Sequence, residues 1–425
     1  MLLRSSRSAL CGEIPIPSSK SHTVRALFFG LLGEGRSVIR NPLDSGDTQA
    51  ALGTVRQLGA TVDAGAEWIV HGLGGEILPA RETVDVMNSG TTLYIAMSVA
   101  ALARGKTEFT GDEQIRRRPA ENLMRALRDL GAKAVSLRAN GCAPLTIEGP
   151  LRGGRTMIEC PTSQYLTSLL MTTPLAEHPS EISVPLLHEA PYVEMTLQWL
   201  DSLNIRYERE EDFSRFRIPS GQRYPAFDRQ MPGDFSSAAF FLCAGAVAGG
   251  PILLKGLDLN DAQGDKAVVD YLRAMGVRIE EEAGGLRVLG GELVGADLDL
   301  NATPDALPAM AVTACFARGR TRLGNVPQAR LKETDRIAVM AQELTRLGAR
   351  VTELPDGLEI VGSRLKGGRV HGHADHRVVM SLCLAGLRTP EPVVIDTAES
   401  VAVTFPSFPE KMAALGGDVA LLPED

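Results

Sequence analysis

Apolar and polar positions along the chain define two kinds of helix-like segment. One kind is apolar nearly all round, as in residues 238–248 and 378–387, and follows a short polar loop. The other kind is amphipathic, as in residues 124–130, and ends at a Leu-Gly or similar pair. A helix that is apolar on all sides must be buried on all sides, whereas an amphipathic helix covers a core with one face. The pattern therefore predicts an inner and an outer set of helices.

The amphipathic segments end at six similar stops. The stops lie at residues 58, 130, 203, 275, 347 and 415, which are 72, 73, 72, 72 and 68 residues apart. Glycine or asparagine follows each stop and favours the left-handed conformation that ends a helix, and a β-rich segment comes next. Short strands ended by Gly or Pro finish most of the copies. We therefore interpret the chain as six copies of a strand–helix–strand–helix–strand–strand unit.

Chain length predicts how these copies are grouped. A chain of 425 residues exceeds the roughly 250–300 residues at which a single core stops growing, so we expect two domains of three copies. The sixth copy ends near residue 422 without its hairpin, and we expect the N-terminal segment to complete that domain. The predicted boundaries are 1–16 for this segment, 17–231 for the first domain and 232–425 for the second, with a hinge at the two crossovers.

Charge and composition exclude several classes of protein. The formal charge of −8 gives no support for binding to nucleic acid or to an anionic membrane surface. Six cysteines are scattered without a C-x-x-C pair, as is typical of buried thiols in a reducing cytosol. The N-terminus lacks the apolar core of a signal peptide, and the apolar run 238–248 is shorter than the about 18 residues needed to cross a bilayer. We expect a soluble, cytoplasmic protein.

Polar loops precede both sets of helices and carry the candidate chemistry. If the copies are arranged alike, these loops gather on one face of each domain, where helix N-termini favour anions. An acidic protein that concentrates its cations there is expected to bind a multiply anionic small molecule, with solvated helix caps as the alternative. The cations are Lys20, Arg25, Arg116, Arg117, Arg118, Lys332, Arg336, His376 and Arg377, and the carboxylates are Asp47, Asp234, Asp305, Glu333 and Asp375.

The densest of these loops is Lys332-Glu333-Thr334-Asp335-Arg336. It directly precedes an apolar run with helical spacing, and Thr334 or Asp335 would cap that helix. By itself such a loop is typical of a solvated, charged cap. Its place as the fifth copy of a repeated helix start indicates a functional loop instead.

Three other patterns favour structure over chemistry. His371 and His373 lie close to Asp375 and His376, but nothing supplies a further ligand pattern, so we predict no metal site. Residues 105–107 lack the first glycine of a phosphate-binding loop and are interpreted as a turn. Cys160 lies at a strand end and is interpreted as a packing residue, not a nucleophile.

Taken in order, the loop motifs resemble the 5-enolpyruvylshikimate-3-phosphate synthase family, whose members are also called 3-phosphoshikimate 1-carboxyvinyltransferases. The resemblance covers essentially the whole chain. It implies two inside-out α/β domains, each of three βαβαββ repeats with buried helices, which close on substrate at the hinge. The motifs are Ser19-Lys20-Ser21 with Arg25, Asn88-Ser89-Gly90-Thr91, Ser163-Gln164, Lys332-Glu333-Thr334-Asp335-Arg336 and Asp375-His376-Arg377.

The activity that this resemblance implies is a transfer of an enolpyruvyl group. The group passes from phosphoenolpyruvate to the 5-hydroxyl of shikimate 3-phosphate, with release of phosphate, in the shikimate pathway of aromatic amino acid biosynthesis. The resemblance implies these two small molecules as partners and no cofactor, and we expect a monomer. Glyphosate mimics phosphoenolpyruvate in this family.

Site residues are carried over from the family position by position. The proton-transfer residues would be Asp305 and Glu333, with Lys20 as a further candidate. Shikimate 3-phosphate would be held by Ser21, Arg25, Thr162, Ser163, Gln164, Tyr192 and Lys332, the last of which could bind either substrate. Phosphoenolpyruvate would be held by Lys20, Gly90, Arg118, Gln164, Arg336, His376 and Arg377.

Three positions depart from the family pattern. Tyr94 stands where the family motif has arginine, Glu189 where a substrate-contacting serine is common, and Val403 where many members carry lysine. These departures leave glyphosate sensitivity open and motivate an alternative, a non-catalytic relative that binds phosphometabolites. A second alternative is UDP-N-acetylglucosamine enolpyruvyl transferase, which shares the fold. Its Lys-Asn pair and catalytic-loop cysteine are replaced here by Lys20-Ser21 and by residues 112–118, which contain no cysteine.

Overall fold

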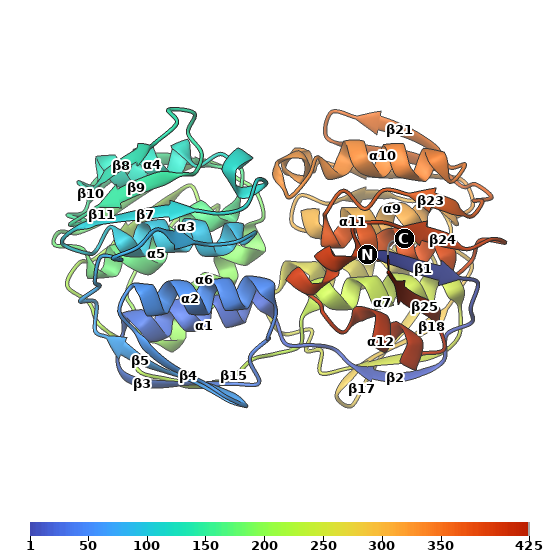
Figure 1. Cartoon of the computed structure of the whole chain (residues 1–425), viewed down its shortest axis with the longest axis horizontal. Helices are drawn as coiled ribbons and strands as arrows, with labels where there is room; N and C mark the ends of the chain where they lie inside the picture. The colour runs from blue at the N-terminus through green and yellow to red at the C-terminus, as the bar shows by residue number, and fades with distance from the viewer. Residues whose placement is uncertain (424–425) are drawn as a thin grey trace. The chain divides into compact units, whose positions relative to one another are not determined.

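The computed structural model describes residues 1–423 and divides into two compact units (Figure 1). Unit 1 combines Met1–Pro17 with the chain from Pro232 onward, and unit 2 is Ser18–Met231. The chain therefore starts in unit 1, passes into unit 2 and returns. Each unit has its own buried helices and its own sheets, so each is described by itself.

Each described unit contains three sheets that share one strand pattern, a parallel pair extended by two antiparallel pairs. In unit 2 the strand orders are β14-β3-β5-β4, β6-β7-β9-β8 and β10-β11-β13-β12, and β15 (Asp228–Gln230) also pairs in parallel with β3. Their bounds are β3 (Gly33–Arg40), β4 (Thr61–Ala64), β5 (Glu67–Leu73), β6 (Val84–Asp85), β7 (Lys106–Thr110), β8 (Lys133–Ser136), β9 (Leu145–Glu148), β10 (Gly154–Cys160), β11 (Ser180–Leu187), β12 (Glu208–Arg209), β13 (Arg215–Ile218) and β14 (Tyr224–Pro225).

In unit 1 the orders are β17-β18-β16-β2, β19-β20-β22-β21 and β23-β24-β1-β25. β1, from the N-terminus, lies antiparallel between β24 and β25, as β22 lies between β20 and β21 (Figure 1). β1 thus supplies the strand that the sixth repeat lacks. The bounds are β1 (Leu2–Ser6), β2 (Gly12–Pro15), β16 (Ile252–Lys255), β17 (Arg278–Glu282), β18 (Gly285–Gly290), β19 (Asp297–Asp299), β20 (Arg320–Gly324), β21 (Arg350–Leu354), β22 (Gly357–Val361), β23 (Gly368–Val370), β24 (Val393–Ile395) and β25 (Asp418–Leu422).

The inner helices are buried nearly all round, as their composition predicts. In each unit the inner helices also contact one another, so that helices lie inside and sheets outside. No helix in the described part of the chain is long and apolar enough to span a membrane. The inner helices are α1 (Lys20–Leu32), α3 (Gly90–Ala100) and α5 (Ser163–Thr172) in unit 2, and α7 (Phe235–Ala248), α9 (Leu307–Cys315) and α11 (His376–Gly386) in unit 1.

The outer helices end where the repeat predicts. The residue after each stop has a positive φ, between +57° at Asn204 and +111° at Gly59, and this left-handed conformation favours Gly or Asn. The outer helices are α2 (Gly46–Gln57), α4 (Glu121–Asp129) and α6 (Ala190–Ser202) in unit 2, and α8 (Val268–Ala274), α10 (Arg336–Arg346) and α12 (Phe408–Ala414) in unit 1.

Residues 105–107, Cys160, His371 and His373, which were interpreted as structural, lie in or next to strands. Of residues 105–107, which were predicted to form a turn, only Gly105 precedes β7, and Lys106 and Thr107 are the first two residues of this strand. Burial raises the pKa of the Cys160 thiol at the end of β10 far above its usual value. His371 Nδ1 lies 2.7 Å from Asp396 Oδ1, and His373 Nε2 lies 3.0 Å from Glu343 Oε1. These two histidines therefore connect the segment between β23 and α11 to Asp396, which follows β24, and to Glu343 on α10.

Candidate active site

Arg336 is the centre of a buried charge cluster in unit 1. It is the first residue of α10, whose N-cap Asp335 accepts a hydrogen bond from the backbone N–H of Ala338. Arg336 is completely buried and donates Nε to Asp375 at 2.8 Å, Nη1 to Asp305 at 2.7 Å and Nη2 to Glu333 at 2.5 Å. One guanidinium thus joins three carboxylates from three different loops.

Asp305 also contacts two further cations. Arg377 Nη2 lies 3.2 Å from its Oδ2, and Lys332 Nζ lies 3.8 Å from its Oδ1. Burial opposes ionisation of this carboxyl, but the charges of Arg377, Lys332 and Arg336 hold its pKa well below the usual range. Asp305 is therefore ionised at neutral pH and can accept hydrogen bonds.

Two more titratable groups are buried in the same cluster. Burial lowers the pKa of His376, at the start of α11, to about 4 against the opposing charges of Glu333 and Asp375. Burial and the neighbouring charge of Asp305 raise the pKa of Asp265, which accepts a hydrogen bond from Ser236, to about 6. The sequence reasoning missed Asp265, although it follows Gly264, which lies at the same offset before its stop as Arg336.

His376 and Asp265 should affect the stability of unit 1 in opposite directions as the pH falls. The unfolded chain protonates histidine near pH 6.5 while folded His376 stays neutral to about pH 4, so stability is lost over this interval. Folded Asp265 takes up its proton near pH 6 and the unfolded carboxyl near 3.8, so it adds stability over that interval. At pH 5 we expect a loss of about 2 kcal/mol from His376 and a gain of about 1 kcal/mol from Asp265.

Urea unfolding at pH 7.5 and pH 5 measures both contributions. His376→Gln should reduce the loss of unfolding free energy between the two pH values by about 2 kcal/mol, and Asp265→Asn should increase it by about 1 kcal/mol. Identical pH dependence in the wild type and both variants would contradict these assignments.

Arg25 is the most deeply buried cation of the predicted set in unit 2. It lies on α1 and donates to Thr196 Oγ1 at 3.0 Å, Thr167 Oγ1 at 3.3 Å, and the carbonyls of Ser21 at 3.1 Å and Tyr192 at 2.9 Å. These acceptors satisfy N–H groups without compensating the charge, and burial lowers the Arg25 pKa to about 10. The structure thus brings Ser21, Arg25 and Tyr192 together in a place that favours an anion.

A second group surrounds the N-terminus of α3. Ser89 caps this helix, and Gly90 is its first residue. A Cβ at Gly90 would overlap Nη1 of Arg118 and lie 3.6 Å from Oε1 of Gln164, so the guanidinium occupies the space that the missing side chain leaves. Gln164 in turn donates to Thr91 Oγ1 at 3.0 Å. Gly90, Arg118 and Gln164 therefore form one cluster, as the resemblance implies.

The N-terminus of α5 holds a carboxylate of the protein itself. Thr162 caps the helix, and Glu189 Oε2 accepts from Ser163 Oγ at 2.9 Å and Ser163 N at 3.3 Å. Glu189 is only 2% exposed and has a φ of +61°. At this position, where the family commonly has serine, a carboxylate occupies donors that the resemblance assigns to shikimate 3-phosphate. Lys20, which the resemblance assigns to phosphoenolpyruvate, pairs with Asp47 at 2.9 Å.

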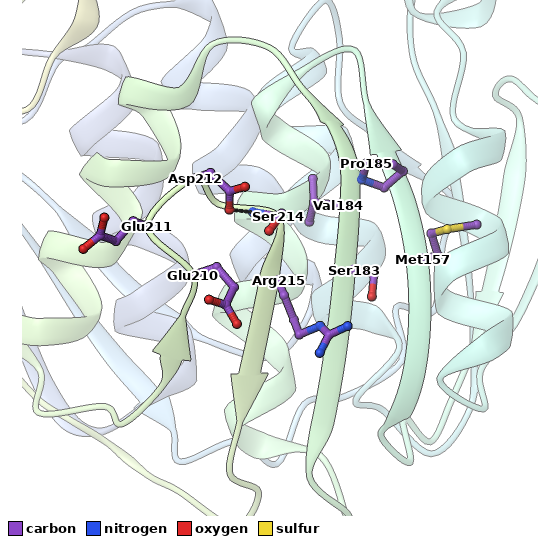
Figure 2. Close-up of a pocket in the computed structure, with 9 residues that line it drawn as sticks. All are labelled: Met157, Ser183, Val184, Pro185, Glu210, Glu211, Asp212, Ser214 and Arg215. Atoms are coloured by element: carbon purple, nitrogen blue, oxygen red, sulfur yellow. Dashed lines mark hydrogen bonds between the residues drawn. The ribbon is translucent and has the colours of Figure 1, made fainter.

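A hollow beside β11 and β13 has an unsuitable charge for an anionic ligand (Figure 2). Its volume is about 870 Å³, and its lining includes Glu210, Glu211 and Asp212 but only one cation, Arg215. Ser214 N donates to Asp212 Oδ1 at 3.0 Å, as the dashed line shows. Its carboxylates repel anions, so the hollow is separate in chemistry from the clusters above.

Comparisons with known proteins agree with the motifs. The model of the EPSP synthase (3-phosphoshikimate 1-carboxyvinyltransferase) family matches residues 5–412. A 3-phosphoshikimate 1-carboxyvinyltransferase of Acetivibrio thermocellus is 50% identical over 421 residues, covering 99% of this chain and 99% of that protein. One from Ruminiclostridium cellulolyticum is 48% identical over 423 residues, covering 99% of this chain and all of that protein.

Solved structures give the same result for the fold. An EPSP synthase structure from Acinetobacter baumannii is similar with a TM-score of 0.83 and 26% identity, covering 99% of this chain and 100% of that one. The predicted class, inside-out α/β domains built from βαβαββ repeats, is confirmed by this likeness and by the buried helices. From its sequence and its fold, the chain belongs to the EPSP synthase family.

Proposed function

We propose that this protein transfers the enolpyruvyl group of phosphoenolpyruvate to the 5-hydroxyl of shikimate 3-phosphate and releases phosphate. The observation that carries the proposal is the buried cluster around Arg336, in which Asp305 and Glu333 lie among the cations Lys332, Arg336 and Arg377. Such a cluster combines proton acceptors with fixed positive charge for an anionic substrate. We also propose that the enzyme acts in the cytoplasm as a monomer.

The binding roles follow the clusters. Arg25, Ser21 and Tyr192, with the α5 start at Thr162, Ser163 and Gln164, would bind shikimate 3-phosphate, and Lys332 would contribute a further charge. The phosphoenolpyruvate ligands would be Lys20, Gly90, Arg118, Gln164, Arg336, His376 and Arg377. The buried, uncompensated charge of Arg25 supports the first assignment, and the guanidinium of Arg118 at the start of α3 supports the second.

The chemistry needs two proton transfers that later reverse. A base takes the proton of the 5-hydroxyl as its oxygen attacks C2 of phosphoenolpyruvate, and an acid delivers a proton to the C3 methylene carbon. Loss of a C3 proton then re-forms the double bond, and the C2–O bond to phosphate breaks. We assign the base to ionised Asp305 and the C3 proton to Glu333, with Lys20 as a further candidate. An anion that takes over Arg336 N–H groups would free Glu333 to accept a proton.

Phosphate release tests the proposal. The protein should release phosphate only when shikimate 3-phosphate and phosphoenolpyruvate are both present, and the organic product should carry the enolpyruvyl ether. Binding of both compounds without any phosphate release would instead identify a non-catalytic relative. Size-exclusion chromatography with light scattering tests the monomer, which should give 45.5 kDa.

Replacing Glu189 should strengthen the binding of shikimate 3-phosphate. In the free protein this carboxylate occupies the Ser163 donors and would repel the substrate phosphate. Glu189→Ser should therefore lower the dissociation constant of shikimate 3-phosphate by about 10-fold, as expected when about 1.4 kcal/mol of repulsion is removed. Isothermal titration measures the constant. A weaker affinity in Glu189→Ser would show that the carboxylate supports the substrate instead.

A further inference from the structure

Two tyrosine hydroxyls converge on one backbone carbonyl in unit 2. Tyr94 Oη donates to the Pro119 carbonyl at 2.9 Å, and Tyr165 Oη donates to the same oxygen at 2.5 Å. The rings pack edge to face, with centroids 4.9 Å apart, and are only 4% and 2% exposed. A carbonyl oxygen has two lone pairs, so this pair of donors uses both of them.

The three residues connect the helices α3 and α5 to the segment that carries Arg118. Tyr94 lies one helical turn after Gly90 on α3, and Tyr165 directly follows Gln164 on α5. Pro119 directly follows Arg118, and its ring fixes φ. The hydroxyls therefore fix the chain at the residue after Arg118 from both helices that contribute Gly90 and Gln164.

Arg118 needs such a restraint because of where its charge lies. Its side chain is buried, and its guanidinium touches Gly90 at the N-terminus of α3. The partial positive charge of a helix N-terminus disfavours a cation, so every contact that holds Arg118 at this place acts against a repulsion. Its backbone is otherwise held by a 3.1 Å bond from Arg118 N to the Ile115 carbonyl and by Ala120 N, which donates to Gly141 at 2.7 Å.

We propose that Tyr94 and Tyr165 are positioning residues that hold Arg118 at the start of α3 for the anionic groups of phosphoenolpyruvate. Tyr94 stands where the family motif has arginine, so this chain replaces a charge with a neutral anchor. The inference rests on the proposed function. The Arg118 guanidinium and the N-terminus of α3 repel each other, and both attract an anion. If the fold already holds them together, substrate binding does not have to supply the free energy that brings them together.

Steady-state kinetics of three variants, Tyr94→Phe, Tyr165→Phe and the double variant, tests the proposal. Tyr94→Phe and Tyr165→Phe should each raise the KM for phosphoenolpyruvate by about three- to tenfold, the effect of one net hydrogen bond, and the double variant should raise it further. The kcat and the KM for shikimate 3-phosphate should stay within about twofold of the wild type, since a fully saturated site still orients both substrates.

Tyr224→Phe is the matched control. Tyr224 is fully buried in the same unit and also donates its hydroxyl to a backbone carbonyl, that of Met171, at 2.8 Å. It should reduce the urea midpoint of unfolding about as much as Tyr94→Phe but leave the KM for phosphoenolpyruvate unchanged. An unchanged KM in the double variant, or an equal rise in Tyr224→Phe, would overturn the proposal. A wild-type protein without turnover would refute the proposed function instead.

Discussion

Glu333→Gln is expected to lower kcat by about 10²- to 10⁴-fold, the usual contribution of a positioned proton-transfer group. Glutamine can still accept the hydrogen bond from Arg336 Nη2 through its amide oxygen, so the cluster should stay assembled. It cannot exchange a proton at neutral pH, so protonation of the C3 carbon should fail. Phosphate release measures the rate, and isothermal titration should give an affinity for shikimate 3-phosphate within about threefold of the wild type.

Glu359→Gln is the control for the loss of one carboxylate charge in unit 1. Glu359 lies on β22, its side chain is 36% exposed, and its Oε2 accepts from Arg320 Nη1 at 2.8 Å. This variant should keep a normal kcat. Near-normal phosphate release by Glu333→Gln would refute the proton-transfer role of Glu333.

Arg336→Gln is expected to destabilise the protein by about 3–5 kcal/mol, the typical effect of removing one partner from a buried ion pair. The substitution leaves Asp305, Glu333 and Asp375 without the cation that joins them. Burial lowers the pKa of this guanidinium, but the charges of Asp375, Glu333 and Asp305 outweigh that effect and keep it charged. Urea unfolding at pH 7.5 measures the loss.

Acidification provides a second readout for this substitution. At pH 5 the carboxylates that have lost the charge of Arg336 can take up protons, so the stability deficit of Arg336→Gln relative to the wild type should shrink. Arg320→Gln is the control, because Arg320 also pairs with two carboxylates, those of Asp297 and Glu359, but its side chain is 46% exposed. It should lose much less stability than Arg336→Gln, because solvent screens an exposed ion pair. Equal losses in the two variants would show that the buried cluster contributes no more than a surface ion pair.

Arg336 in unit 1 and Arg25 in unit 2 have different kinds of partner. In unit 1 Arg336 is already joined to carboxylates of the protein, so its position is fixed before any substrate arrives. In unit 2 the hydrogen bonds of Arg25 within the described residues go to neutral oxygens, which leave its charge able to attract an anion.

The repeat, the two kinds of helix and the fold class could be predicted from the sequence, because each depends on local patterns. Gly59 and Asn204 mark helix ends through their own backbone preferences, and the apolar run of α7 requires burial whatever surrounds it. The start of α10 at Arg336, with Asp335 as its cap, followed from residues adjacent in the chain. The loop motifs were also enough to indicate the family, which the comparisons confirm.

The partners of the charged residues were decided by the tertiary structure alone. The sequence placed Arg336, Asp305 and Asp375 on separate loops of two repeats, and only the tertiary packing brings residues 31 and 39 positions apart within hydrogen-bonding distance. It likewise gave no sign that Glu189 would occupy the start of α5, or that Tyr94 and Tyr165 would share the Pro119 carbonyl. Local sequence sets the conformation of each loop, but the charge and hydrogen-bond partners of a buried group come from whichever distant segments pack against it.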